Sequence, residues 1–539
     1  MSVAGSFNLA SALVDAHVEA GRGGHAAIRH QGRTLTYAEV EVEVDRCGNA
    51  LRGLGVGPGD RVALLLPDSP EFIVSFFGAV KIGAVALPLS TLLPGEGLAY
   101  MLSDSEATAL IADAATLDRP RTFRERLPHL RHVIVVDAAT GSEHAYSRLR
   151  QGPARTESEP KARESYCALL DAADARLEAA PTTASDMCFW QYSSGTTGRP
   201  KAVMHRMRDL WEVAERYGRH VIGMTSADRS FSLAKLYFSY GLGNSLAFPF
   251  RYGATVVLHP GRPEPAAVFD LVARERPTLF YAVPTAYAAL LAAAEAGAPA
   301  DLSSVRCCVS AGEPLPKALF ERWQRRFGLE IVDGIGSTEV GYIFISNVPG
   351  QVRPGTSGRV VPGFGAKVVD EQERPVPSGQ VGDLWVKGPS TFAGYWGQPD
   401  RTERTIRGGW VVTGDRYSLD PDGYFTYAGR SDDMLRVGAM WVSPIEVESA
   451  LLEHSSVLEC AVVGHADADG LVKPAAYVVL RPGVAGGSAL AAEMQASMEA
   501  RLAPFKRPRW IRFVADLPKT PTGKIQRFRL REMREEVTV

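Results

Sequence analysis

The chain has few cysteines and no excess of charge of either sign, and each shortage excludes a class of protein. Six scattered cysteines in 539 residues, with no CxxC pair, argue against a disulfide scaffold or a zinc ribbon. With 59 basic and 61 acidic residues, the formal charge of −2 excludes a basic nucleic-acid footprint over the whole surface. We therefore expect a protein of a reducing compartment, the cytoplasm, with no nucleic-acid partner.

Two further absences concern export and membranes. Residues 1–20 contain no lysine or arginine, so they lack the positive start of a signal peptide. The most apolar stretch, residues 72–89, is interrupted by Lys81 and by two glycines. A transmembrane helix needs about 20 predominantly apolar residues, so this stretch is more typical of a buried helix followed by a strand. We expect no membrane partner.

Short apolar runs alternate with helix-length amphipathic segments through most of the chain. Residues 61–66, 84–89 and 109–112 predict strands, and residues 70–81 predict a helix between the first two. Further strands are predicted at residues 134–136, 255–258, 279–283 and 306–309. Such alternation is typical of parallel sheets covered by helices, so we predict the α/β class.

The character of the sequence changes twice towards its end. After Val352, glycines and prolines separate short β runs, which predicts a small β-rich subdomain over about residues 352–431. A new unit of alternating helices and strands follows, long enough for a small α+β lid domain. We therefore predict an N-terminal domain over residues 1–431 and a mobile C-terminal domain over residues 432–539.

The sharpest local pattern is a run of hydroxyl residues and glycines that a lysine closes: Ser193, Ser194, Gly195, Thr196, Thr197, Gly198, Arg199, Pro200 and Lys201. Glycines let backbone N–H groups approach a phosphate, hydroxyls add donors, and a lysine adds charge. The run is no Walker A loop, because Pro200 stands where that loop opens a helix. A flexible polar loop is the alternative, which the ordered Gly-Arg-Pro-Lys end disfavours.

This run resembles the phosphate loop of the adenylate-forming superfamily, which includes acyl- and aryl-CoA synthetases, peptide-synthetase adenylation domains and firefly-type luciferases. Later motifs agree with that family in order and spacing: residues 310–314, 333–339, 413–415, 429–434 and 518–527. The resemblance covers about residues 190–530. It implies a two-domain enzyme that uses ATP and Mg²⁺ and transfers an acyl group to a thiol.

The resemblance also implies roles for single residues. The implied nucleotide-binding residues are Ser193, Ser194, Gly195, Thr196, Thr197, Gly198, Lys201, Gly312, Glu313, Pro314, Asp333, Gly334, Ile335, Asp415 and Arg430. Within this set, Asp415 resembles the carboxylate that accepts the ribose hydroxyls, with Arg430 beside it. The family usually carries an aromatic residue at the place of Ile335, so we expect weaker stacking on adenine.

Three residues are implied to be catalytic: Thr338, Glu339 and Lys524. Thr338 and Glu339 resemble the motif that contacts phosphate, and Glu339 would be the metal ligand because a carboxylate suits Mg²⁺. Lys524 resembles a lysine whose ammonium offsets the negative charge that develops when a carboxylate attacks the α-phosphate. Asp432 resembles the hinge about which the small domain rotates between an adenylating and a thioester-forming pose.

Residues 234–244 and 343–347 narrow the resemblance to the benzoate–CoA ligase branch. An aromatic acid needs a flat apolar slot with a polar mouth. The implied substrate-binding residues are Phe238, Ser239, Tyr240, Gly241, Gly336, Gly341, Tyr342 and Ile343.

One departure from that branch bears on the acid. Benzoate ligases typically carry Leu-His where this chain has Gly341-Tyr342, which removes bulk and adds a hydroxyl that can donate or accept. The glycine also resembles 2-aminobenzoate (anthranilate)–CoA ligases. We therefore expect a substituted benzoate, with 2-aminobenzoate first, benzoate next and hydroxybenzoates after.

The resemblance implies CoA as the acceptor. The implied CoA-binding residues are Gly438, Ala439, Trp441, Phe505 and Arg507. The family usually has glycine at the place of Ala439, so the extra methyl narrows the expected pantetheine tunnel. Three alternatives stay open: an enzyme that loads a carrier-protein phosphopantetheine, a luciferase-like oxygenase, and a nucleotide-binding module without catalysis. A homodimer is left open as well.

Overall fold

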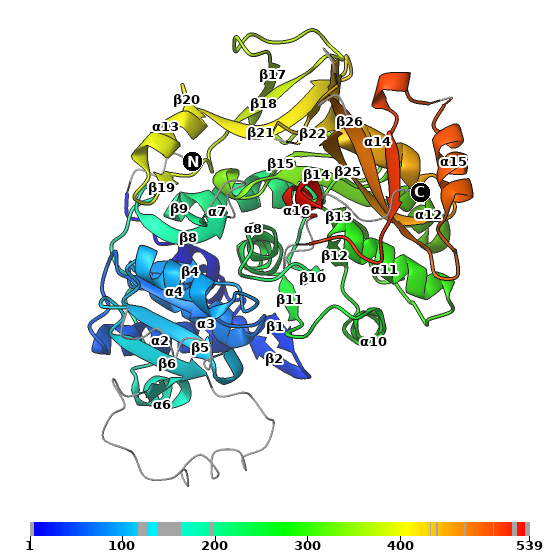
Figure 1. Cartoon of the computed structure of the whole chain (residues 1–539). Helices are drawn as coiled ribbons and strands as arrows, with labels where there is room; N and C mark the ends of the chain where they lie inside the picture. Colours follow the sequence, from blue (N-terminus) through cyan, green and yellow to red (C-terminus); the bar gives the residue numbers. More distant parts are fainter. Residues whose placement is uncertain are drawn as a thin grey trace, which may run out of the picture.

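The computed structural model describes residues 5–116, 127–136, 163–193, 199–431, 433–437, 440–467, 471–499, 501–519 and 525–533. Two large sheets with flanking helices form most of the chain, and smaller sheets form its last third (Figure 1). The α/β class with a large N-terminal part and a small C-terminal α+β part is therefore confirmed. Within the described residues, no helix has the length and apolarity needed to cross a bilayer.

The first large sheet has eight strands and carries the predicted phosphate-loop region. Its order is β19 (Gly394–Tyr395), β9 (Lys201–Arg206), β8 (Met187–Ser193), β4 (Val85–Pro88), β3 (Arg61–Leu65), β5 (Ala109–Asp113), β6 (His132–Val136) and β7 (Arg163–Ser165). Strands β8 and β9 pair antiparallel, with Ser193 opposite Lys201. The two ends of the predicted phosphate loop are thereby held together.

Helix α3 (Pro70–Lys81) matches its predicted bounds and explains the interrupted apolar stretch. It begins at a proline, whose fixed φ suits the first helical position, and Glu71 is the one residue of the helix outside the core. Lys81 is buried but paired, with its ammonium 2.8 Å from Asp15 Oδ1 and bonded to Asp45. A buried charge is tolerated here because two carboxylates pair with it, of which Asp45 is buried as well.

The second large sheet has nine strands and is parallel through its centre. Its order is β16 (Arg359–Val360), β15 (Ile343–Ser346), β14 (Ile331–Gly336), β13 (Cys307–Ser310), β12 (Leu279–Ala282), β10 (Arg229–Ser232), β11 (Thr255–Leu258), β1 (Ala26–His30) and β2 (Arg33–Thr36). One core joins residues of both large sheets, and a second core lies under helices α10 (Pro265–Glu275), α11 (Pro284–Glu295) and α12 (Lys317–Phe327). The strand predictions hold to within one or two residues.

The last third of the chain holds the smaller sheets. The β-rich sheet consists of β17 (Gly365–Val369), β18 (Val381–Lys387), β20 (Ile406–Arg407), β21 (Trp410–Leu419) and β22 (Phe425–Arg430). The C-terminal part holds β23 (Leu435–Val437), β24 (Met440–Val442), α14 (Pro444–Leu452), β25 (Val457–Ala466), β26 (Val472–Leu480), α15 (Ser488–Ser497), β27 (Trp510–Phe513) and α16 (Arg527–Glu532). It lies beside the yellow β-rich sheet, where α14 contacts β22 (Figure 1).

Short helices and turns connect these elements. They are η1 (Ser11–Asp15), α1 (Ala16–Glu19), α2 (Tyr37–Gly53), α4 (Gly95–Asp104), η2 (Ala114–Thr116), α6 (Tyr166–Ala172), α7 (Met207–Val213), η5 (Ala214–Ile222), α8 (Ser239–Leu242), η6 (Gly243–Ala247), α9 (Phe248–Tyr252), η7 (Thr338–Val340), α13 (Pro399–Thr405) and η8 (Pro504–Lys506). The predicted division at residues 431 and 432 stays a prediction.

Candidate active site

The predicted lysine and glutamate lie together at one point of the molecule. Lys201 Nζ is 3.0 Å from Glu339 Oε1, and the hydroxyl of Tyr395 bridges them, 2.6 Å from the ammonium and 2.8 Å from the carboxylate. Burial by itself raises the pKa of Glu339, but the Lys201 ammonium and the bonds to it outweigh burial and hold that pKa below its usual range. The cluster is therefore an ion pair.

Backbone contacts fix the turn η7 that carries Thr338 and Glu339. His205 Nε2 lies 2.7 Å from Thr338 O, and its Nδ1 lies 3.0 Å from Asp209 Oδ2. On the other side, Phe392 N donates to Glu339 O at 2.8 Å. His205, Asp209 and Tyr395 were not predicted from the sequence, because none of them lies in one of the recognised motifs.

Asp415 and Arg430 also meet. They stand opposite each other on strands β21 and β22, and Arg430 Nη1 lies 3.0 Å from Asp415 Oδ1. Arg430 also donates to Thr413 O at 3.1 Å. Gly414, which lies between Thr413 and Asp415 in the sequence, has φ +73°, and a Cβ there would lie 2.9 Å from Arg430 Nη2. The positive φ favours glycine at this position of the motif, and a side chain there would also displace the end of the arginine.

The two motifs expected around adenine follow neighbouring parallel strands. Strands β13 and β14 pair with Ser310 opposite Asp333, so the segments after them lie at the same sheet edge, where α/β folds place ligands. Asp333 is 7% exposed, and burial raises the pKa of its carboxyl to about 8. Gly312 and Pro314 are exposed, while Ile335 is half-buried. Glu313 Oε2 accepts from Thr285 Oγ1 at 2.7 Å.

The residues expected around the acid come from α8 and from the start of β15. The rings of Tyr240 and Tyr342 lie 5.8 Å apart between centroids. Phe238 is half-buried against Tyr237, with 4.7 Å between ring centroids. Ile343 is 2% exposed. The structure thus brings Tyr240 and Tyr342 together, while Phe238 contacts the neighbouring Tyr237.

Glycines in and beside these segments allow close approach of the backbone. A Cβ on Gly241 would lie 2.0 Å from Lys235 O, and one on Gly336 would lie 2.5 Å from Tyr342 O. Gly334 has equally little space for a side chain, since a Cβ there would lie 2.8 Å from Ile345 O. No side chain fits at any of the three positions, because the atoms in the way belong to the backbone.

Gly341 has a different physical reason from the one that the sequence suggests. Its φ is +85°, a conformation that glycine adopts readily, whereas a Cβ there would meet only ordinary contacts at 3.4 Å and beyond. The next residue, Tyr342, is 3% exposed and donates its hydroxyl to Asn244 Oδ1. The glycine thus sets the turn that sends Tyr342 inward.

The structure gives no side-chain positions for several of the predicted residues. Ser194, Gly195, Thr196, Thr197, Gly198, Asp432, Gly438, Ala439 and Lys524 lie outside the described residues. Trp441 is described by its backbone alone, in β24. Phe505 packs at the edge of the C-terminal core, and Arg507 donates to the carbonyls of Leu502 and Glu499 at 3.0 and 3.1 Å.

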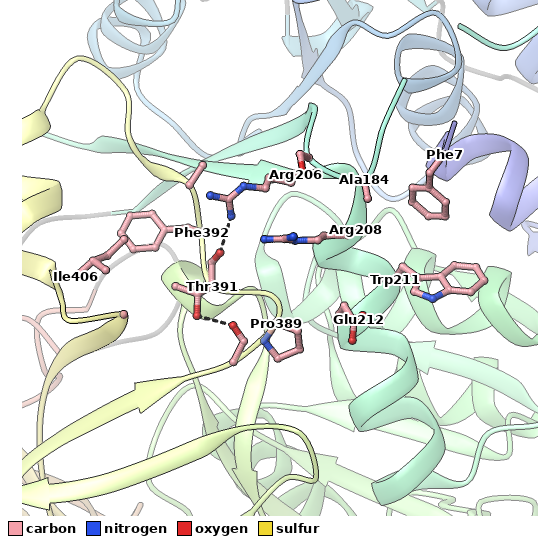
Figure 2. Close-up of a pocket in the computed structure, with 14 residues that line it drawn as sticks. Phe7, Ala184, Arg206, Arg208, Trp211, Glu212, Pro389, Thr391, Phe392 and Ile406 are labelled. Atoms are coloured by element: carbon pink, nitrogen blue, oxygen red, sulfur yellow. Dashed lines mark hydrogen bonds between the residues drawn. The ribbon is translucent and has the colours of Figure 1, made fainter. Parts of the chain in front are cut away.

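A cavity of about 540 Å³ lies elsewhere, between α7 and the segment from Gly388 to Gly409. Figure 2 shows the guanidinium groups of Arg206 and Arg208 pointing into it. Arg206 Nη1 donates to Thr391 O at 3.0 Å. None of the residues predicted for the site lines this cavity.

Comparisons with known proteins identify the family of the chain. Residues 15–396 match the family described as AMP-binding enzyme, and residues 446–524 match the AMP-binding enzyme C-terminal domain. The chain is 45% identical to the benzoate–CoA ligase of Thauera aromatica, over 97% of this chain and 96% of the relative. It is 31% identical to the anthranilate–CoA ligase of Pseudomonas aeruginosa, over 94% and 93%.

Two solved structures are similar over nearly the whole chain. The anthranilate–CoA ligase AuaEII in complex with anthranoyl-AMP has a TM-score of 0.90 and 41% identity, covering 98% of this chain and 97% of that one. A benzoate–CoA ligase from Burkholderia xenovorans LB400 has a TM-score of 0.87 and 42% identity, covering 97% and 100%.

The chain therefore belongs to the AMP-binding enzyme family. Within that family it falls in the benzoate–CoA ligase branch, so the predicted resemblance is confirmed. It is an AMP-forming acid–thiol ligase of the aryl-CoA class.

Proposed function

We propose that this enzyme joins benzoate, or a benzoate that carries a small ring substituent, to CoA. In the first half-reaction the carboxylate attacks the α-phosphate of ATP, giving an aryl-adenylate and pyrophosphate. In the second the CoA thiol displaces AMP and forms the thioester. One observation carries the proposal: the rings of Tyr240 and Tyr342 lie 5.8 Å apart, and Tyr342 directly follows the turn that carries Glu339, with Gly336 packed against the backbone of Tyr342.

The charged cluster supports the nucleotide part of the proposal. We assign the ammonium of Lys201 to the phosphates, where a cation forms charge-assisted hydrogen bonds. Asp415 would accept the ribose hydroxyls, and Asp333 would face the adenine edge. The predicted Lys524 would offset charge at the α-phosphate during attack.

Mg²⁺ fits the residues present. The contacts of the Glu339 carboxylate with Lys201 and Tyr395 run through Oε1, and Oε2 would serve the ion. No group of three potential ligands occurs among the described residues, so Glu339 would hold the ion together with nucleotide phosphates, as is usual for Mg²⁺. The ion would neutralise negative charge on the nucleotide phosphates.

The acid is proposed from the slot and from the relatives. A flat ring fits between aromatic side chains better than a flexible acyl chain does. The relatives named above act on benzoate and on anthranilate, which is 2-aminobenzoate. We keep 2-aminobenzoate as the first candidate, benzoate as the second and hydroxybenzoates as the third.

The experiment separates the two half-reactions. Purified enzyme with MgATP should release pyrophosphate only when an aryl acid is added, and should release AMP in step with thioester only when CoA is added too. A rate that is the same with octanoate as with benzoate would contradict the aryl assignment. An aryl-adenylate that CoA does not turn over would contradict CoA as acceptor.

A further inference from the structure

The polar groups of the proposed acid slot are three hydroxyls, on Ser239, Tyr240 and Tyr342. A hydroxyl has one proton and two lone pairs. When it gives that proton to an acceptor of the protein, it can only accept from a ligand. The partners of these hydroxyls therefore decide which ring substituents the slot can satisfy.

The proton of Tyr342 is committed to Asn244. Ser232 Oγ donates to Ala234 O at 3.0 Å, so it has only lone pairs to offer the Asn244 amide, which lies 3.1 Å away through Nδ2. The amide must then present its NH₂ to Ser232 and its oxygen to Tyr342. Asn244 is 0% exposed, so bulk solvent does not reach these bonds.

The proton of Ser239 is committed to Gln191 in the same way. Ser239 Oγ lies 2.6 Å from Gln191 Oε1, and Gln191 Nε2 lies 3.5 Å from Tyr237 O. Turning the amide over would set its oxygen against that carbonyl oxygen, which is unfavourable. Gln191 is 3% exposed, so its orientation is set by these protein contacts.

The third hydroxyl follows the pattern. Tyr240 donates to Val309 O at 2.9 Å, and a backbone carbonyl can only accept. Ser239, Tyr240 and Tyr342 therefore have their single protons bound to protein acceptors. Towards a ligand, they offer lone pairs alone.

We propose that Gln191 and Asn244 are specificity-determining residues that make the slot a hydrogen-bond acceptor, so that the enzyme selects aryl acids with a donor on the ring. Amino and hydroxyl substituents satisfy the lone pairs. Methyl, fluoro, methoxy and nitro groups of similar size leave them unpaired or oppose them. This proposal rests on the proposed function, and unsubstituted benzoate stays a substrate because it brings no opposing group.

The test compares pairs of acids that differ in donor ability and little in size. These are 2-aminobenzoate against 2-methylbenzoate and 2-hydroxybenzoate against 2-fluorobenzoate, with the 3-substituted pairs beside them. For at least one ring position, kcat/KM for adenylation should favour the donor about 10- to 100-fold. Equal values within each pair would overturn the proposal while leaving aryl-CoA formation intact.

Two variants locate the source of the preference. Gln191→Met removes the acceptor for Ser239, which can then turn its proton to the ligand, and Tyr342→Phe removes an oxygen altogether. The donor preference should fall at least threefold in one of them, mainly through a higher kcat/KM for the methyl or fluoro acid. An unchanged preference in both variants would overturn the proposal.

Tyr287→Phe is the matched control. Tyr287 is a buried tyrosine that donates to the same Val309 carbonyl at 2.9 Å, but it belongs to the second core under the helices. Loss of the Tyr287 hydroxyl should leave the donor preference unchanged from that of the unaltered enzyme. A fall in the donor preference as large as in the other two variants would overturn the proposal. Failure of every ring acid to release pyrophosphate would instead defeat the proposed function itself.

Discussion

Lys201 and Glu339 form a buried ion pair, with 3.0 Å between the ammonium and the nearer carboxylate oxygen. The two residues lie on different sheets, Lys201 at the start of β9 and Glu339 in the turn after β14. Their side chains are 13% and 16% exposed, so solvent screens the pair little. We therefore expect the pair to be sensitive to the loss of either charge.

Glu339→Gln tests this pair. The amide keeps the shape but removes the charge that balances Lys201 and that would hold Mg²⁺, so adenylate formation should fall about 100-fold or more. Acid-dependent exchange between pyrophosphate and ATP measures the effect. Glu295→Gln is the control, because Glu295 pairs with Arg322 on the surface. A Glu339→Gln variant as active as the control would contradict the assignment.

Tyr395→Phe removes the hydroxyl that joins the pair and keeps the ring, whose centroid lies 4.0 Å from the Lys201 ammonium. A hydrogen bond to a charged group contributes about 1.5–3 kcal/mol, so KM for MgATP should rise about tenfold. KM for the aryl acid should change less than threefold. Steady-state kinetics with each substrate varied in turn measure both KM values. A rise in KM for the aryl acid alone would contradict the assignment of this hydroxyl to the nucleotide site.

Asp333 predicts a dependence of stability on pH. Its pKa is about 8 in the folded chain against an ordinary value of 3.8. Below the ordinary value both states are protonated. Between about pH 4 and 8 the unfolded state ionises first, so the carboxyl's contribution to stability is lost as pH rises through this window.

Asp333→Asn removes that loss, because the amide does not titrate. The free energy of unfolding of the variant, relative to the unaltered chain, should therefore increase from pH 5 to pH 8. Urea unfolding at several pH values measures the difference. A difference that stays constant, or that shrinks with rising pH, would show that Asp333 is ionised in the folded chain.

Lys524→Ala separates the half-reactions. Removal of the ammonium should abolish adenylate formation, because the charge that develops during attack on the α-phosphate is then no longer offset. Thioester formation from a supplied aryl-adenylate and CoA should remain largely intact. Rapid-quench measurement of both steps tests the prediction, and a variant that forms the adenylate from ATP at the usual rate would refute it.

The sequence predicts much of the fold because local patterns decide it. The helix over residues 70–81 and the strand over residues 255–258 have their predicted bounds, since apolar runs and turn residues mark them. The structure also brings the motif residues Lys201 and Glu339 into contact. These features depend on neighbours in sequence or on an ordered set of motifs.

The supporting contacts could not be predicted in this way. Tyr342 and Asn244 are 98 positions apart, and Ser239 and Gln191 are 48 apart. No spacing rule connects such residues, because the packing of whole sheets brings them together. For the same reason the sequence left Tyr342 able to donate or accept, whereas its surroundings leave it an acceptor.

The most direct test of the account is one competition assay. Purified enzyme receives MgATP, CoA and equimolar benzoate, 2-aminobenzoate, 3- and 4-hydroxybenzoate and octanoate, and mass spectrometry identifies the first thioester formed. We predict an aryl-CoA, with an equal amount of AMP, and 2-aminobenzoyl-CoA ahead of the others. Octanoyl-CoA as the first product, or an aryl-adenylate without thioester, would contradict the account.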